Sequence, residues 1–221
     1  MTTPATPRRR TRLSPDARRE QLVEIGARLF AERPFNDVWI EEVAKQAGVS
    51  RALIYHYFPN KRDFYAAIIR HGLRDTFELT APDQSQPPER WLTSGIERLI
   101  GYVEQNADAF RAIYRGRHSL DDEVLEAIRE GHEAQVARIS EMLSPDEPAS
   151  ATIRLAIEGW IAMFDALVLD WLDNRPIPRE QLVQLLGGSL AGIIVAALGV
   201  DGRPERAKQI AYLAPDVFPR R

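Results

Sequence analysis

The 221-residue sequence predicts an all-α protein. Apolar residues recur at helical spacing along most of the chain, and prolines and glycines divide these stretches into segments of helical length. Strand-like alternation never extends beyond a few residues, and no internal repeat is present. We therefore expect a disordered basic arm over residues 1–13, a small helical domain over residues 14–70 and a larger helical body over residues 71–221.

The helices of the small domain are marked by their caps. Ser14, followed by a proline and an acid, starts the first helix, which ends at Pro34. A second helix follows at about residue 38. Ser50 then caps the third helix, and Asn60 caps a long fourth helix that we expect to bridge the two domains.

The body is divided by the same signals. Residues 81–88 contain three prolines and several short polar residues, so we place the domain boundary near this break. Later prolines and glycines separate further segments with helical periodicity. These segments cover residues 89–105, 107–116, 120–143, 149–173, 179–199 and 203–213.

Composition limits the classes of function. The chain contains no cysteine, which excludes disulfides, thiolate metal sites and cysteine nucleophiles. The formal net charge of −3 hides an asymmetry, because residues 1–70 hold 13 Lys or Arg against 8 Asp or Glu and the remainder holds 16 against 24. A basic head on an acidic body fits a nucleic-acid contact at one end, although surface charge also differs between domains for other reasons.

The chain is expected to be cytoplasmic, with no membrane partner. No apolar run reaches the roughly 18 residues of a membrane span. The N-terminal arginines are not followed by the apolar stretch of a secretory signal.

The stretch Ile40–Phe58, IEEVAKQAGVSRALIYHYF, carries the strongest functional signal. Ala44 is small enough for two helices to approach closely, and Gly48 accepts the positive φ of a sharp turn between helices. The inward apolar positions are Val43, Ala47, Val49, Ile54 and Tyr57. This is the helix-turn-helix layout, whose second helix enters the major groove of DNA.

The segment AGVSRALIYHYFPNKRDFY resembles the DNA-binding domain of the TetR family of bacterial transcriptional regulators. The match covers roughly residues 14–70, and beyond it only length, helical pattern and helix order agree. The resemblance implies a three-helix DNA-binding domain followed by a helical bundle for ligand binding and dimerisation. It also implies a homodimer that binds a palindromic double-stranded DNA operator and is released by a small-molecule effector, and no cofactor is expected.

The start of the third helix supplies the main DNA-binding candidates. The hydroxyl of Ser50 caps the helix and can also meet a phosphate. Arg51 pairs either with a guanine edge or with a phosphate, and Ala52 lets the helix sit close to a thymine methyl. Tyr55 shares the face of Arg51 one turn later. The resemblance implies that Tyr55 contacts backbone or base and that His56 contacts phosphate.

Two candidates flank this helix. The resemblance makes Lys61 a phosphate clamp at the start of the fourth helix, with a solvated lysine as the alternative. Family members often carry Ser or Thr near positions 38–40, whereas Trp39 stands here and Asp37 is the nearest capping residue. The indole N–H of Trp39 reaches the DNA backbone, or the side chain covers the core. The arginines of residues 8–12 either track DNA or form a solvated tail.

The two long helices near the C-terminus are the dimerisation candidates. The first carries an apolar surface of Leu155, Gly159, Phe164, Leu167 and Trp171. The second carries a strip of small residues with apolar flanks, namely Gly187, Gly188, Ala191, Gly192, Leu185, Ile193, Ile194 and Leu198. The resemblance implies an interface of two helices from each subunit, and packing within one subunit is the alternative. A two-fold axis would set the recognition helices about 34 Å apart.

Six aromatic residues fall on helices that the resemblance places around a ligand pocket: Trp91, Tyr102, Phe110, Tyr114, Trp160 and Phe164. Each alone is an ordinary core residue, but the set predicts an apolar or amphipathic effector. His118 and His132 are candidates for orienting a polar group of that effector. Neither has a partner at metal-ligand spacing in the sequence, so we predict no metal site.

Two other classes of function compete with a repressor. An enzyme would use His118 or His132 as a base, but no phosphate loop, metal cluster or nucleophile with a base at recognisable spacing accompanies them. A helical lipid or acyl-chain binding protein would explain the apolar body without operator specificity. We expect a DNA-binding regulator that is not an enzyme.

Overall fold

The computed structural model describes residues 13–33, 37–115, 121–143 and 148–213, and these contain ten α-helices and no strand. This confirms the all-α prediction. The helices of the head are α1 (Pro15–Glu32), α2 (Ile40–Ala47), α3 (Arg51–Tyr57) and α4 (Lys61–Leu79). Those of the body are α5 (Pro88–Gln105), α6 (Ala107–Arg115), α7 (Asp122–Leu143), α8 (Ala151–Asn174), α9 (Arg179–Val200) and α10 (Pro204–Leu213).

The predicted capping residues start their helices. The side chains of Ser14 and Ser50 each accept a hydrogen bond at 3.2 Å from the backbone amide three residues later. Asn60 accepts one from the amide of Asp63 at 2.9 Å. These bonds satisfy amides that the first turn of a helix leaves without a partner, which is why short polar residues predicted these three boundaries well.

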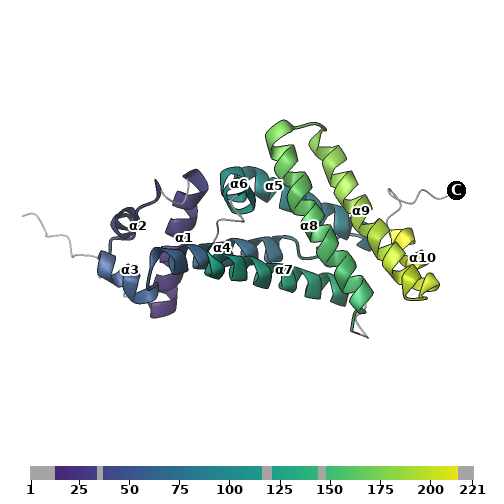
Figure 1. Cartoon of the computed structure of the whole chain (residues 1–221), viewed down its shortest axis with the longest axis horizontal. Coiled ribbons are helices and arrows are strands. Elements are labelled where there is room, and N and C mark those ends of the chain that lie inside the picture. Colours follow the sequence, from purple (N-terminus) through teal and green to yellow (C-terminus); the bar gives the residue numbers. More distant parts are fainter. Residues whose placement is uncertain (1–12, 34–36, 116–120, 144–147, 214–221) are drawn as a thin grey trace, which may run out of the picture.

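The helices form an elongated molecule with the head at one end and α8 to α10 at the other (Figure 1). Helices α4 and α7 lie side by side between the two ends. One apolar core joins α1 to α4 with the first turns of α7, and a second joins α5 to the later turns of α7 and to α8 and α9. Helix α4 extends to Leu79, beyond residue 70 where we placed the end of the small domain. Helix α7 contributes residues to both cores.

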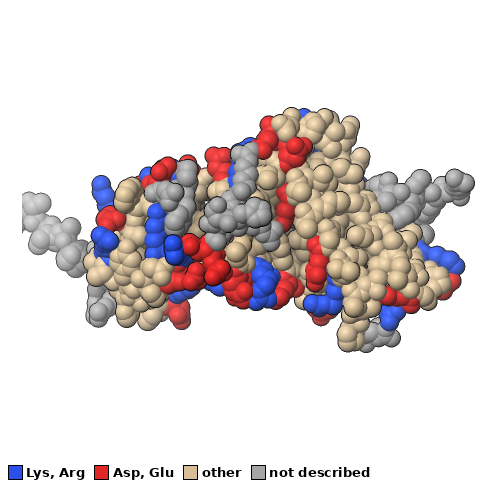
Figure 2. Space-filling view, viewed as in Figure 1, with Lys and Arg blue, Asp and Glu red and all other residues tan. Residues whose placement is uncertain are grey.

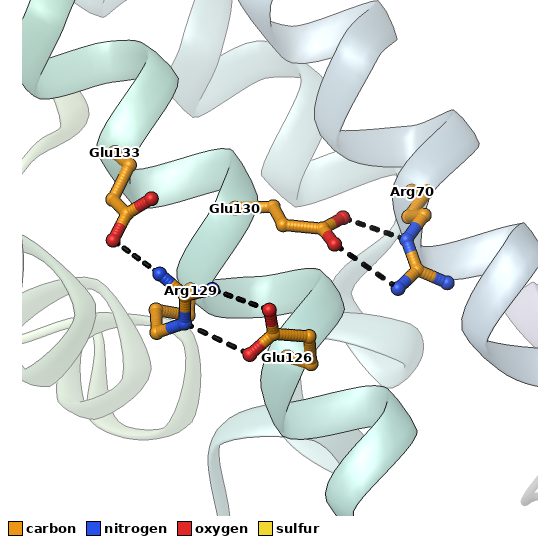
Figure 3. A network of polar contacts seen from close by, with 5 residues as sticks. All are labelled: Arg70, Glu126, Arg129, Glu130 and Glu133. Carbon is orange, nitrogen blue, oxygen red and sulfur yellow. Dashed lines mark hydrogen bonds and ion pairs between the residues drawn. The ribbon is translucent and has the colours of Figure 1, made fainter.

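The contact between α4 and α7 is close. A Cβ atom added at Gly131 of α7 would lie 2.7 Å from a methyl carbon of Leu73 of α4, so a larger residue there would force the Leu73 side chain to shift. Ion pairs continue the contact on the outside (Figure 3). The guanidinium of Arg70 on α4 pairs with both carboxylate oxygens of Glu130 on α7, at 2.7 and 3.3 Å. On α7 itself, Arg129 joins Glu126 and Glu133.

This arrangement predicts a pH-dependent stability term at Glu130. Its hydrogen bond with Arg70 is the largest cause that lowers the pKa of Glu130 from its ordinary value of 4.5. A lowered folded-state pKa stabilises the protein above the unfolded pKa, and that stability is lost as the pH falls through the folded pKa. Both side chains are more than one-third exposed, so we expect Glu130→Gln to lower the free energy of unfolding by less than about 1 kcal/mol at neutral pH.

Urea unfolding followed by circular dichroism at a series of pH values measures this difference. Glu141→Gln, which changes an exposed glutamate on the same helix outside the network, is the control. A difference between wild type and Glu130→Gln that persists unchanged into acid would contradict the assignment.

Helices α8 and α9 bury only part of their apolar surface. Two residues of the apolar surface that we named as a dimerisation candidate pack inside the subunit instead, since Phe164 is 6% exposed and Trp171 is 2% exposed. On α9, Gly187, Ala191, Ile194 and Leu198 likewise face the subunit's own core. Helical periodicity fails here because both faces of these helices are apolar.

What remains outside is a largely apolar face with few charges. The outward apolar residues include Leu155 at 70% exposure, together with Leu185, Ile193 and Val200. Figure 2 shows few charged side chains over α8 and α9, whereas charges gather over the middle of the molecule. Among the described helices, α9 is the one that is long and apolar enough to cross a membrane. It packs against α5, α8 and α10, however, as a core helix does.

Candidate nucleic-acid interface and internal cavity

The turn between α2 and α3 is made by Gly48. Its φ of 64° and ψ of 38° place it in the left-handed region, which favours glycine. The amide of Gly48 donates to the carbonyl of Lys45, and the amide of Val49 donates to the carbonyl of Ala44 at 3.0 Å. These bonds end α2 abruptly, so α3 leaves at a sharp angle, as the sequence predicted.

One side of helix α3 packs into the core of the head, and the other side is exposed to solvent. Ile54 is fully buried and Phe58, directly after the helix, is 2% exposed. The predicted contact residues lie on the other side: Ser50, Arg51, Ala52 and His56 are exposed, and Tyr55 is half-buried. All five therefore belong to the outward side of α3 or to its N-cap, and α3 lies at one end of the molecule (Figure 1).

Arg51 is held in place by two neighbours. Its Nη1 lies 2.6 Å from a carboxylate oxygen of Glu41 on α2, and its Nη2 donates to the hydroxyl of Tyr55 at 3.4 Å. The guanidinium carbon also lies 5.3 Å from the centroid of the Tyr55 ring. The hydrogen bond with Tyr55 and then the charge of Glu41 raise the pKa of Arg51. The sequence did not indicate Glu41 as part of this surface, because Glu41 lies on α2 whereas Arg51, with which it pairs, lies on α3.

Lys61 is the first residue of α4 and is half-buried. Burial lowers the pKa of Lys61, and the negative charge of Asp37 acts in the opposite direction. Asn60 fixes this end of α4 twice, since its amide oxygen accepts from the backbone of Asp63 and its amide nitrogen donates to the Asp63 carboxylate, both at 2.9 Å. These bonds cap the first turn of α4, in which Lys61 lies.

Trp39 does not cover the core, because 66% of it is exposed. Helix α2 begins at Ile40, and no side chain caps it, so the expectation that Asp37 is its cap was wrong. The buried neighbours Val38 and Ile40 fill the core instead, which turns Trp39 outward. Its indole remains a candidate for a DNA contact. The arginine-rich arm lies outside the described residues.

The body contains a cavity of about 460 Å³. This is within the roughly 300–1,000 Å³ typical of small-molecule sites. Six predicted ligand residues share its wall: Trp91, Tyr102, Phe110, Tyr114, Trp160 and Phe164. His118, the seventh, lies outside the described residues. The cavity is also lined by the head, through α1 and α4 residues such as Phe30 and Ile68.

The polar groups of the cavity come from several helices. Nε2 of His132 on α7 lies 3.5 Å from the hydroxyl of Tyr114 on α6 and 3.7 Å from a carboxylate oxygen of Asp165 on α8. No sequence pattern indicated this carboxylate, because Asp165 is far from His132 along the chain. Burial raises the pKa of Tyr102, so this hydroxyl keeps its proton. Within the described ranges, no group of three or more His, Asp or Glu side chains suits a metal ion.

The head presents a short, exposed helix after a glycine turn, and the helical body behind it contains a cavity. This combination defines a DNA-binding transcriptional regulator of the helix-turn-helix class. Residues 22–68 match the family described as "Bacterial regulatory proteins, tetR family", and residues 88–191 match "Tetracyclin repressor-like, C-terminal domain". The chain belongs to the TetR family.

Individual relatives agree with this assignment. The transcriptional regulator AcuR of Cereibacter sphaeroides is 36% identical over 213 residues, which cover 83% of this chain and 91% of AcuR. The HTH-type transcriptional activator FasR of Mycolicibacterium smegmatis is 26% identical over 186 residues, 80% of this chain and 83% of FasR. A tetR-family regulator from Streptomyces coelicolor has a crystal structure that matches with a TM-score of 0.78 at 26% identity, covering 94% of each chain.

The protein is therefore a DNA-binding transcriptional regulator, and TetR-family regulators are not enzymes. This sets aside both the enzyme and the carrier without operator specificity.

Proposed function

We propose that the protein is a cytoplasmic homodimeric repressor that leaves a palindromic operator when a small apolar or amphipathic effector enters the body. Residues 14–70 form the DNA-binding domain in this proposal, and residues 71–221 form the domain for ligand binding and dimerisation. Residues 1–13 form a basic arm in front of them.

The proposed DNA contacts are Ser50, Arg51, Ala52, Tyr55, His56, Lys61 and Trp39. Their exposure around one end of the molecule supports this set, because they converge from α2, α3 and α4. Arg51 reads a base edge in the groove, and the hydroxyls and Lys61 fix the head on phosphates.

The proposed dimer interface is the outward face of α8 and α9. A largely apolar surface with few charges on two neighbouring long helices supports it, since contiguous apolar patches of this kind mark protein interfaces. Added Cβ atoms at Gly159 and Gly192 would meet nothing within 4 Å, so neither glycine is required for packing inside the subunit. Close approach of a second copy gives both a physical reason.

The observation that carries the effector proposal is the shared wall of the cavity. The cavity touches α1 and α4 of the head as well as the helices of the body, so a ligand that fills it contacts the helix that carries Lys61. A ligand shifts an equilibrium only if it binds one state better than the other. Contact with α4 supplies such a difference, because the position of α4 sets the position of the head.

Transcription in vitro tests the direction of regulation. We expect the dimer to reduce transcription from a promoter that overlaps its operator, and we expect a bound effector to restore it. Increased transcription on addition of the dimer would make the protein an activator, as the relative FasR is named. Equal effector affinity in the presence and absence of operator would refute the coupling between cavity and head.

A further inference from the structure

Arg138 on α7 connects the cavity to the end of α4. Its side chain lines the cavity and is half-buried. The guanidinium donates to the backbone carbonyl of Phe77 and to the hydroxyl of Thr80, and its carbon lies 4.1 Å from the centroid of the Phe77 ring. It also donates to the side-chain oxygen of Gln135 at 2.7 Å. One cavity residue therefore holds the last turn of α4.

A second arginine holds the same turn from outside the cavity. Arg98 on α5 donates to the carbonyls of Leu79 at 2.7 Å and Ala81 at 2.9 Å. The C-terminal end of a helix carries unsatisfied carbonyls and a partial negative charge, so two guanidinium groups are well placed there. Arg98 does not line the cavity, whereas Arg138 does. The two side chains thus share one structural role and differ in access to a ligand.

Arg138 is a half-buried positive group of the cavity wall, and within the described part of the chain no acidic side chain pairs with it. Its three acceptors are neutral, and burial alone lowers the pKa of Arg138. The acids that line the cavity face histidines, Asp165 beside His132 and Asp75 beside His71, while Arg28 of α1 is exposed. A half-buried charge without a counter-charge is costly, and an anion supplied by a ligand would offset that cost.

We propose that Arg138 recognises a carboxylate on an apolar effector, and that the bound carboxylate takes the guanidinium away from the end of α4. This rests on the proposed function, because it takes the cavity as the effector site. A guanidinium has five N–H donors, and the three hydrogen bonds described above come from its two Nη atoms, so a carboxylate can bind through Nε and compete for the Nη donors. The apolar wall, including Leu92, Ile96 and Phe110, receives the rest of the molecule.

The exchange has a direct mechanical consequence. When the carboxylate competes for the N–H groups, the Phe77 carbonyl and the Thr80 hydroxyl lose a charged donor. The last turn of α4 is then held by Arg98 alone. Because Lys61 lies at the other end of this helix, the loss of one anchor changes how firmly the head is placed.

Binding of straight-chain carboxylates, from hexanoate to tetradecanoate, and of primary alcohols of the same lengths tests this inference. The fluorescence of Trp91 and Trp160 in the cavity wall reports binding to the full-length protein, below the micellar concentration of each probe. We expect the best carboxylate to bind at least about tenfold more tightly than its matched alcohol, since charge-assisted bonds are the stronger ones.

Two variants assign the preference to Arg138. Arg138→Gln removes the charge and is expected to bring the ratio of carboxylate to alcohol affinity close to one, with alcohol binding retained. Arg98→Gln removes the matching anchor of α4 and is expected to keep the wild-type ratio. Arg138→Lys keeps the charge and is expected to keep a carboxylate preference. If Arg138→Gln were misfolded, it would also lose alcohol binding, so retained alcohol binding together with the result for Arg138→Lys separates loss of the charge from loss of the fold.

A wild-type protein that prefers no carboxylate, or that binds neither series, overturns the inference. So does a carboxylate preference that survives in Arg138→Gln. The proposed function stands separately, because a dimer that leaves its operator with some other ligand would refute only the role of Arg138. A protein that binds no operator would refute the proposed function, while the affinity ratio would still decide what Arg138 recognises.

Discussion

Gly192→Arg is expected to convert the protein into a monomer that has lost most of its operator affinity. The glycine lies on the outward strip of α9, and an added Cβ atom there meets nothing within 4 Å. Within the subunit, arginine is therefore accommodated, and it is a better helix former than glycine by roughly 0.5–1 kcal/mol. Between two apposed helices, the same side chain fills the space of the second copy with a desolvated charge.

The loss of DNA affinity follows from bivalency. Two heads on one dimer bind two half-sites at once, and linkage of two contacts raises affinity by about 10²–10⁴-fold over a single contact. Sedimentation equilibrium and a gel-shift titration with the operator measure the two effects. Ala134→Arg, at an exposed position of α7, introduces the same side chain away from the proposed interface and is expected to change neither. A dimeric Gly192→Arg with wild-type operator affinity would show that the interface lies elsewhere.

Arg51→Ala is expected to weaken operator binding by at least about tenfold for each half-site, or about a hundredfold for the dimer. A bidentate contact of arginine with a guanine edge contributes about 1–3 kcal/mol of discrimination. Arg51 is exposed at the start of α3, and Tyr55 orients it from one turn further on. Loss of the side chain removes base reading, so specific DNA should lose more affinity than random DNA. Fluorescence anisotropy with both DNAs measures this difference.

Neighbouring variants sharpen the test. Glu41→Gln removes the carboxylate that pairs with Arg51 at 2.6 Å, which in the proposed complex would lie near the DNA phosphates, so it is expected to strengthen binding. Lys61→Ala is expected to weaken specific and random DNA alike and to lower the salt dependence by about one phosphate contact for each head. Lys208→Ala, on an exposed lysine of α10, is the control for lost charge. Wild-type affinity for Arg51→Ala and Lys61→Ala together would show that the contact surface is misassigned.

Local chemistry made the head predictable from sequence. Ser14, Ser50 and Asn60 cap their helices through bonds to residues three positions away, and Gly48 makes its turn with its own backbone. Such features depend only on residues a few positions apart, so they can be recognised in the sequence. The all-helical class and most helix ends followed in the same way.

Features that depend on packing between distant segments were not predictable. Sequence alone did not separate the inner from the outer residues of α8, such as Phe164 and Trp171, because both sides of this helix are apolar and only tertiary contacts distinguish inside from outside. Asp165 reaches His132, and Arg138 reaches Phe77, only through the fold. The cavity wall was predicted from its aromatics but not in its charged groups.

Trp39 shows a third kind of limit. Between the buried residues Val38 and Ile40, sequence alone offers no reason to turn a tryptophan outward. The backbone at residue 39 is extended, so successive side chains point in opposite directions. Its exposure leaves an indole N–H at the surface of the head, next to the start of α2.

Selection of binding sites from random DNA with the full-length protein, followed by footprinting, tests the central claim most directly. We predict that the recovered sites are inverted repeats whose half-sites lie about one DNA turn, 34 Å, apart, and that one dimer protects both. Gly192→Arg should lose this protection at concentrations where the wild-type protein gives it. Recovery of no preferred sequence, or of single half-sites without symmetry, would contradict a dimer that reads a palindromic operator through α3.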